Sequence, residues 1–170
     1  MLLRPGQSSY PELLLETRGK KKVANEMRPD LIPAVAAASK ALWKQQRPQA
    51  MLRSMTGTYN CVGMVVASRR TWVDTDDLLR ILREDGYRLL ANEAETEKGD
   101  VVVYRDQKGD VSHVGIVVRK NPYNPENPKD VLVVLSKWGA EGEYEHDASY
   151  VPLLCGKPVE YWTDRKGVTP

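Results

Sequence analysis

The stretch GDVVVYRDQKGDVSHVGIVV, residues 99–118, contains two short apolar runs separated by a polar turn. The first run, Val101 to Tyr104, follows a Gly-Asp pair, and the second, residues 113–118, follows a turn that contains Gly109. Runs of β-branched residues bounded by glycine and aspartate are typical of strands, and a short polar link between two runs is typical of a hairpin. Because both runs are almost continuously apolar, we expect these strands to lie centrally in a sheet.

Two further strands are expected after this hairpin. The run from Val131 to Leu135 predicts a third strand, which follows a loop rich in proline and asparagine at 121–130. Residues 157–163 predict a last strand. Residues 139–150 are polar and rich in glycine and glutamate, and we interpret them as a loop.

Three helices are expected before the hairpin, because apolar residues there recur at helical spacing. They are predicted to cover residues 30–46, 59–70 and 76–85, with Asp30 as the cap of the first. Helices followed by an antiparallel meander make an α+β arrangement. We therefore expect N-terminal helices packed on a small antiparallel β-sheet.

The length of 170 residues suits one compact domain, and a hydrophobic fraction of 41% is enough to form a core. We expect an irregular basic N-terminal segment over residues 1–29 and a single domain over residues 30–170. Residues 1–53 contain ten Lys/Arg and four Asp/Glu, whereas the rest of the chain is acidic. We interpret the basic region as solvated surface, with an acidic protein partner as the alternative. Nucleic-acid binding is not expected, because no aromatic–basic motif accompanies the charge.

The sequence also predicts where the protein acts. No apolar run is long enough to span a bilayer, so no membrane association is expected. The N-terminal apolar stretches are short and precede the basic cluster, which is the wrong order for a signal peptide. We therefore expect a cytoplasmic protein, unless another protein exports it by a non-classical or effector route. The two cysteines, Cys61 and Cys155, are expected to be free thiols.

Cys61 and His113 are the residues that indicate chemistry. Cys61 follows a Thr-Gly-Thr break and opens an apolar helical run. Unpaired backbone N–H groups at a helix start favour the thiolate, which is the nucleophilic form of cysteine. His113 is one of two histidines and begins a predicted strand, where it can point into a cleft as a general base. A single cysteine is more often a packed core residue, and a single histidine more often lies in a surface turn, so the prediction rests on the pair.

The segments NCVGMVVAS, EKGDVVVY and SHVGIVV resemble, in order and spacing, motifs of the NlpC/P60 and CHAP superfamily of papain-related cysteine peptidases and amidases. The resemblance covers residues 59–136 and implies a papain-like NlpC/P60-type fold, with Cys61 as nucleophile and His113 as base. It also implies that Tyr59 and Asn60 help to bind the oxyanion or the substrate, and Asn60 stands where many members have aspartate. The C-terminal half, through SKWGAEGEYEH and CGKPVEYW, resembles an uncharacterised bacterial papain-like group as well.

A third residue orients the histidine in that superfamily, and the sequence leaves its identity open. Pairing the third predicted strand with the second brings Ser136 opposite His113, with Lys137 on the other face. His146 is an alternative that would reach the site from its loop. The catalytic candidates are therefore Cys61, His113 and Ser136, with His146 and Lys137 as alternatives for the third position.

The resemblance implies a cysteine hydrolase that cleaves an amide or peptide bond. Its substrate would be a peptide or a peptidoglycan fragment, and no cofactor is expected. Two alternatives stay open, a papain-like binding module without activity and an acyl transferase or deamidase that uses the same Cys–His pair. No metal site is predicted, because the spacing of the cysteines and histidines does not match a zinc site.

Overall fold

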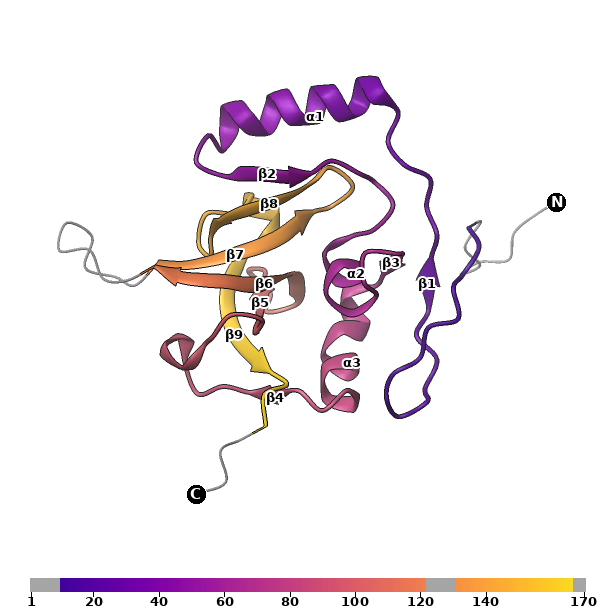
Figure 1. Ribbon diagram of the computed structural model, residues 1–170, viewed down its shortest axis with the longest axis vertical. Coiled ribbons are helices and arrows are strands. Elements are labelled where there is room, and N and C mark those ends of the chain that lie inside the picture. The colour runs from indigo at the N-terminus through magenta and orange to yellow at the C-terminus, as the bar shows by residue number, and fades with distance from the viewer. Residues whose placement is uncertain (1–9, 122–130, 167–170) are drawn as a thin grey trace.

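The computed structural model describes residues 10–121 and 131–166. Its centre is a sheet of seven antiparallel strands in the order β2-β8-β7-β6-β5-β9-β4 (Figure 1). The strands are β2 (Met51–Ser54), β4 (Arg88–Leu89), β5 (Val101–Arg105), β6 (Val111–Asn121), β7 (Val131–Trp138), β8 (Gly142–Asp147) and β9 (Lys157–Thr163). The predicted hairpin is β5 and β6, and the other two predicted strands lie within β7 and β9. Most of the loop predicted at 121–130 lies outside the described residues.

The expected fold class, a papain-like α+β fold with N-terminal helices on a small sheet, is wrong. A large antiparallel sheet dominates the structure, and its helices are few and short. The prediction missed β2 and β8. It interpreted residues 139–150 as a loop because they are polar, yet Glu143, Tyr144, Glu145 and His146 are all buried in β8. Arginines from other segments pair with the two glutamates, and this compensation cannot be inferred from local composition.

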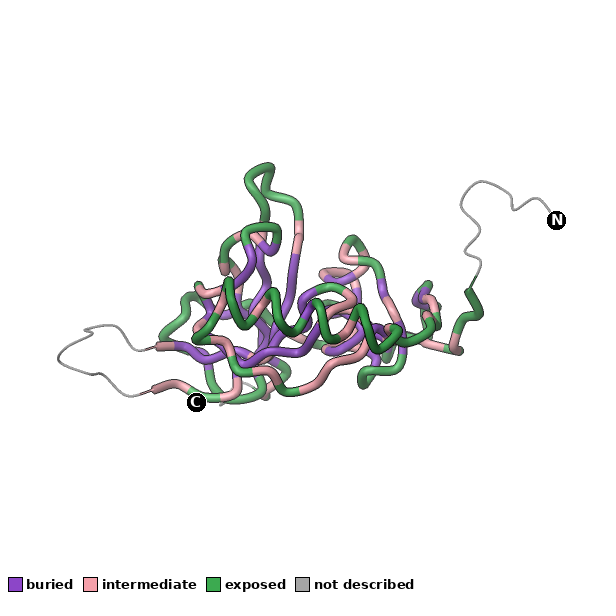
Figure 2. The backbone as a smooth tube through the Cα atoms, turned by 90° about the horizontal axis from the view of Figure 1, so that it is seen from above, coloured by how far each residue is buried: buried purple, intermediate pink, exposed green. Residues whose placement is uncertain are grey.

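Three α-helices accompany the sheet: α1 (Pro33–Gln46), α2 (Cys61–Val66) and α3 (Leu78–Glu84). α1 has one buried residue, Ser39, and its exposed turns are visible in Figure 2. Asp30 does not cap α1. Ile32 is the N-cap residue, and the Asp30 carboxylate accepts instead from the backbone N–H groups of Leu31 and Gly57. Among the described residues, no helix combines the length and the apolar character needed to cross a membrane.

α2 and α3 are both shorter than the sequence suggested. α2 ends at Val66 because the chain then turns through positive φ angles at Ser68 and Arg69. A 3-10 turn over Thr75–Asp77 precedes α3, and the side chain of Asp74 caps that turn, as is usual for aspartate at a helix start.

Two apolar clusters lie on opposite faces of the sheet, because successive residues of a strand point to opposite sides. We call the side that carries α2 and α3 the helix face. There, Val103 of β5 and Val114 of β6 pack in one cluster with Cys61. We call the other side the outer face, where Tyr104 and Val134 belong to a second cluster. α1 covers part of the outer face through an edge contact between Trp43 and Trp138, whose ring centroids are 5.1 Å apart.

The N-terminal segment has little regular secondary structure over its described part, but it packs against the rest of the chain. β1 (Asn25–Glu26) pairs with β3 (Trp72–Val73) in a separate two-stranded sheet beside α2 (Figure 1). Val23 is buried in the same cluster as Cys61. Thr17 and Lys21 both bind the carboxylate of Glu84 on α3. This segment is therefore part of the packed structure, and residues 1–9 lie outside the described residues.

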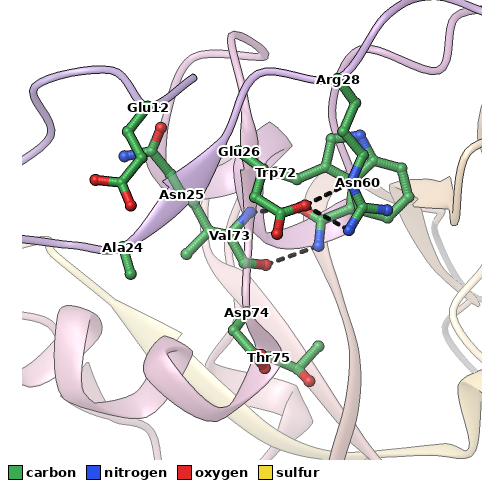
Figure 3. A pocket seen from close by; sticks show the side chains of 10 residues that line it. All are labelled: Glu12, Ala24, Asn25, Glu26, Arg28, Asn60, Trp72, Val73, Asp74 and Thr75. Carbon is green, nitrogen blue, oxygen red and sulfur yellow. Dashed lines mark hydrogen bonds and ion pairs between the residues drawn. The ribbon is translucent and has the colours of Figure 1, made fainter. Parts of the chain in front are cut away.

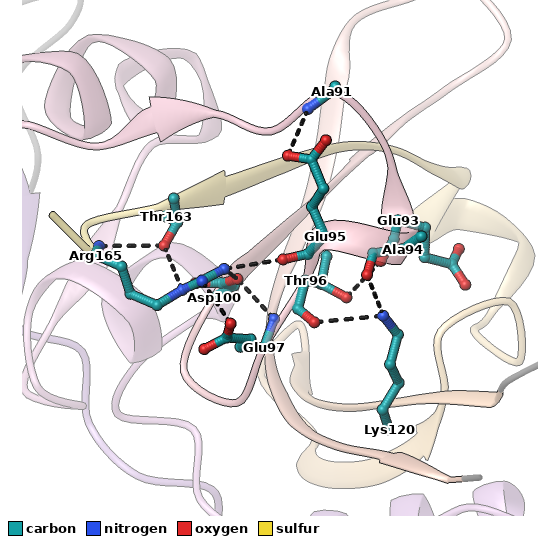
Figure 4. Close-up of polar contacts among 10 residues, drawn as sticks. All are labelled: Ala91, Glu93, Ala94, Glu95, Thr96, Glu97, Asp100, Lys120, Thr163 and Arg165. Atoms are coloured by element: carbon teal, nitrogen blue, oxygen red, sulfur yellow. Dashed lines mark hydrogen bonds and ion pairs between the residues drawn. The ribbon is translucent and has the colours of Figure 1, made fainter. Parts of the chain in front are cut away.

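Arg165 anchors the chain after β9 to the segment that leads into β5 (Figure 4). Its guanidinium binds the buried carboxylate of Asp100 at 2.6 Å and that of Glu97 at 2.8 Å, and it donates to the Glu95 carbonyl oxygen at 3.0 Å. Burial raises the pKa of Asp100, but the hydrogen bonds that it accepts, including those from Arg165, outweigh burial and hold the pKa below its ordinary value.

Candidate functional site

The structure divides the predicted site residues between the two faces of the sheet. On the helix face lies a group that we call the thiol cluster: Tyr59, Cys61, Arg69, Lys137 and Glu143. On the outer face lies a group that we call the histidine cluster: Tyr104, His113, Ser136, Trp138 and His146. The sheet itself stands between the two groups.

Asn60 positions the helix that begins with Cys61. Its side-chain oxygen accepts from the Gly63 N–H at 2.9 Å and from the Val73 N–H at 3.2 Å, while its amide nitrogen donates to the Val73 carbonyl at 2.7 Å. These bonds cap α2 and tie it to β3. The close approach requires Gly63, because a Cβ atom there would lie 1.7 Å from the carbonyl oxygen of Thr71. The Asn60 side chain, expected near the oxyanion, is thus engaged in holding the helix.

The Cys61 thiol is buried, with 6% of the residue exposed. Burial raises the pKa of this thiol to about 11, although backbone N–H groups, foremost that of Val114, and the charge of Lys137 act to lower it. The thiol is therefore protonated at neutral pH in this conformation.

Lys137 is fully buried on the same face, near enough to Cys61 for a thiolate there to stabilise its ammonium form. Its Nζ donates to the Gly139 carbonyl oxygen at 2.8 Å and lies 5.3 Å from the centre of the Tyr59 ring. Burial lowers the pKa of Lys137 to about 8. Nearby negative charges act to raise this pKa, and the largest of these effects is that of a Cys61 thiolate. Within the described parts of the chain, no carboxylate forms a direct ion pair with this amine, so its burial is costly.

Glu143 joins the other members of the thiol cluster. The Tyr59 hydroxyl donates to the Glu143 carboxylate at 2.8 Å, and Arg69 Nε donates to the same oxygen at 2.8 Å. Glu143 is also the cross-strand neighbour of Lys137 in the β7–β8 pair. Sequence reasoning missed Glu143 and Arg69. The signal that could have found Glu143 is the alternation of acidic and aromatic residues in GEYEHD, which has the period of a strand.

Ser136 and His146 form a hydrogen-bonded pair on the outer face. Ser136 Oγ lies 2.7 Å from His146 Nε2, and His146 Nδ1 lies 2.7 Å from the Asp147 carbonyl oxygen. Because a carbonyl only accepts, Nδ1 carries the proton and Nε2 accepts from the serine hydroxyl. Trp138 Nε1 donates to Ser136 Oγ at 3.1 Å. All of these side chains are buried, and Ser136 pairs across the sheet with Gly115, not with His113 as expected.

His113 lies near this pair and away from Cys61. Its ring centroid is 5.2 Å from that of Tyr104, its cross-strand neighbour. Its Nε2 has no hydrogen-bond partner among the described residues. Burial foremost, together with the charge of His146, lowers the pKa of His113 to about 3. The expected contact between Cys61 and His113 is not formed, since the next residue, Val114, is the one that faces the thiol.

A pocket of about 450 Å³ lies beside the start of α2 and is lined by residues of the paired strands β1 and β3 (Figure 3). Its lining residues are Glu12, Ala24, Asn25, Glu26, Arg28, Asn60, Trp72, Val73, Asp74 and Thr75. The Arg28 guanidinium lies 4.0 Å from the centre of the Trp72 ring and also binds Glu26 at 2.7 Å. Among the described residues, no group of three or more His, Cys, Asp or Glu side chains could hold a metal ion.

The part of the chain that contains both clusters matches a protein family. A family model with the description "Domain of unknown function (DUF7689)" matches residues 50–162, more than half of the chain. The chain belongs to this family. The DUF7689 match includes every residue of the thiol and histidine clusters, whereas β1 and α1 lie before it. A search of curated proteins and a search of solved structures gave no match.

Proposed function

We propose that the chain is a cysteine-dependent enzyme that cleaves an amide or peptide bond, with Cys61 as nucleophile and Lys137 as its proton acceptor. The observation that supports the proposal is the buried Lys137 amine, which has no direct carboxylate partner among the described residues and interacts with the Cys61 thiol. Perturbed ionisable groups of this kind gather at functional sites. Lys137 takes the role that the sequence had assigned to His113, because His113 lies on the other face.

In the proposed reaction, the neutral amine of Lys137 takes the proton of the Cys61 thiol and leaves a thiolate beside an ammonium group. The thiolate attacks the carbonyl carbon of the amide. The carbon–nitrogen bond breaks, the leaving amine takes the proton from Lys137, and a thioester remains. Water then attacks the thioester, which releases the carboxylic acid and returns a proton to the sulfur. With an amine in place of water, the same intermediate would give a transferase.

The lowered pKa of Lys137 supports this role. With a pKa of about 8, roughly a tenth of the amine is neutral at pH 7, compared with less than a thousandth at its ordinary value of 10.5. The burial of Cys61 sets a further requirement, which is that substrate binding must displace part of its cover. Val23 of the N-terminal segment packs in the same cluster as Cys61, so this segment is our candidate for the part that moves.

A peptide or peptidoglycan fragment is the proposed substrate, as the NlpC/P60 resemblance implies. The pocket in Figure 3 is consistent with a peptide side chain near the start of α2, since Asn60 lines it. The relationship to NlpC/P60 enzymes rests on the three sequence motifs. The domain bounds of 30–170 and the cytoplasmic location also stay predictions.

Alkylation tests the proposed link between Lys137 and the thiol. In a Cys155→Ser background, Cys61 is the remaining thiol, and its rate of reaction with iodoacetamide against pH reports its pKa. Lys137→Met should raise that pKa, and each unit of rise lowers the thiolate fraction about tenfold. Lys40→Met, at an exposed position of α1, is the control and should leave the profile unchanged.

Product analysis tests the activity itself. Wild type and Cys61→Ala are incubated with muropeptides and with a peptide library, and cleavage is read by mass spectrometry. Products that form with wild type and are absent with Cys61→Ala support the proposal. Equal patterns for the two proteins, together with a Cys61 profile that Lys137→Met does not change, would refute it.

A binding module without catalysis is the second candidate. The burial that raises the pKa of the Cys61 thiol to about 11 favours it, because a protonated and covered thiol is a poor nucleophile. The same pair of experiments separates the two candidates, since a binding module predicts no cleavage of either substrate set and slow alkylation at neutral pH.

A further inference from the structure

Two adjacent leucines are presented to solvent by the 3-10 turn η3 (Leu153–Cys155). Leu153 is 91% exposed and Leu154 is 92% exposed. They border a groove of about 1240 Å³ that also includes the half-exposed Val159 of β9 and the turn at 106–109 between β5 and β6. Exposed apolar side chains gathered around one concave surface mark a site of interaction.

The turn that carries the leucines is firmly attached to the sheet. The Cys155 carbonyl oxygen accepts from Ser112 Oγ at 2.8 Å, and the Cys155 side chain is buried in the outer-face cluster. Gly156 follows with a positive φ of 78°, and a Cβ atom there would lie 2.1 Å from the carbonyl oxygen of Arg105. The turn therefore cannot fold the leucines inward without breaking these contacts.

The neighbouring part of β9 has an open backbone edge. On one side, β9 pairs with β5 along its length. On the other side, β4 pairs with β9 at Trp162 and Thr163, and Leu90 donates to the carbonyl oxygen of Tyr161. Over residues 157–160, no strand in the described parts of the chain pairs with that outer edge. Open edges of this kind accept an added strand from another chain.

Positive charges outnumber negative ones around the groove. Glu160 is bound by Arg105, with Nε at 2.8 Å from its carboxylate. The Asp106 carboxylate accepts from two backbone N–H groups of its own turn. Asp106 keeps its negative charge, so three cations (Arg105, Lys108 and Lys157) face two carboxylates (Asp106 and Glu160) around the groove. Among the described residues, Lys108 and Lys157 have no acidic partner and can pair with a ligand.

We infer that this groove binds an extended segment of a partner protein. The segment adds as a strand to the open edge of β9, places apolar side chains against Leu153 and Leu154, and directs acidic side chains toward Lys108 and Lys157. The concave shape fits a peptide strand better than a flat bilayer surface. A second copy of the chain fits poorly, because a symmetric contact would bring the basic rims of both copies together.

Selection from a displayed library of short random peptides, panned on the full chain, tests the inference. The enriched peptides should alternate apolar residues with Asp or Glu, and the best of them is then synthesised for anisotropy measurements. Leu153→Asp combined with Leu154→Asp should weaken its binding about tenfold or more, as expected for central apolar contacts. Leu14→Asp is the matched control, because Leu14 is 88% exposed elsewhere, and it should leave the affinity unchanged.

Hydrogen exchange provides the second readout. The bound peptide should slow exchange of the Val159 amide, which lies two residues before Tyr161 and therefore faces the same open edge, and a contact through the leucines alone would not do this. The inference is overturned by peptides that lack the alternation, by binding that survives the double variant, or by unchanged exchange in β9. A dimer in light scattering that the double variant abolishes, or binding of the chain to phosphatidylcholine–phosphatidylglycerol vesicles through the leucines, would overturn it as well. All three substitutions lie at exposed positions, and thermal melting checks that each variant folds.

Discussion

Lowering the pH should destabilise this protein already at pH values well above those at which carboxylates titrate. The buried His113 is the cause. His113 is 2% exposed, and burial lowers its pKa to about 3 from an ordinary value of 6.5. Between these two values, the unfolded chain binds a proton that the folded chain does not. The free energy of unfolding therefore falls as pH falls from 6.5 toward 3, and the full stability is present above that window.

The size of the effect follows from the shift. Each pH unit inside the window costs about 1.4 kcal/mol, so acidification from pH 7 to pH 5 should cost about 2 kcal/mol through His113 alone. The pKa of His146 is lowered too, by burial foremost, and its titration adds in the same direction. The pKa values of Asp100 and Glu145 are held below 3.8 and 4.5 by their ion pairs, which outweigh burial, so these carboxylates contribute mainly below pH 5.

Urea unfolding at several pH values between 5 and 7.5 measures this dependence. His113→Phe keeps an aromatic ring against Tyr104 and removes the titrating group, so its free energy of unfolding should vary less with pH, by about 2 kcal/mol over that range. Tyr104→Phe is the matched control, a buried neighbour whose hydroxyl does not titrate there because burial raises its pKa well above 10. Equal pH slopes for wild type and His113→Phe, or NMR titration of His113 near pH 6.5, would refute the reasoning.

Three further substitutions have defined outcomes in the same unfolding assay. Gly63→Ala should cost about 3 kcal/mol, because its Cβ atom would meet a backbone carbonyl oxygen at 1.7 Å, whereas Gly19→Ala meets nothing closer than 3.6 Å and should be near neutral. Arg165→Leu should cost about 2 kcal/mol at pH 7 by leaving the buried Asp100 without its cation, and little at pH 3, where Asp100 becomes protonated in the variant. Between pH 8 and pH 9 the unfolded chain keeps the proton that folded Lys137 loses, so the free energy of unfolding of wild type should rise by about 1 kcal/mol relative to that of Lys137→Met; the buried thiols of Cys61 and Cys155 act in the opposite direction but are common to both proteins.

The central strands could be predicted because their pattern is local. The runs at 101–104 and 157–163 are confirmed as β5 and β9, since apolar residues between turn signals leave few other structures. The strand β8 could not be recognised in the same way. Its glutamates are buried against arginines that are distant in sequence, such as Arg53 and Arg69, and composition alone made it look like a solvated loop.

The candidate site shows the same division. The placement of Cys61 at a helix start and of His113 at the start of a strand was predicted from neighbouring residues. The helix α2 begins at Cys61 as predicted, whereas β6 begins at Val111, two residues before His113. Lys137 was named only as an alternative third residue, and its burial beside the thiol was not predicted, because lysine is rarely buried without a partner. Its burial depends on the packing of α2 and β8 around it. The helix α2 is distant from Lys137 in sequence, and β8 was not predicted as a strand.

The sequence by itself determined that a thiol would begin a helix and that a histidine would lie in a buried strand of a hairpin. Only the tertiary structure decided which face of the sheet each side chain would occupy. The register of β6 against β5 pairs His113 with Tyr104 and Val114 with Val103, and α2 packs on the side of the valines. Because successive strand residues point to opposite sides, a difference of one residue places the imidazole behind the sheet and leaves Cys61 with Lys137 as its ionisable neighbour.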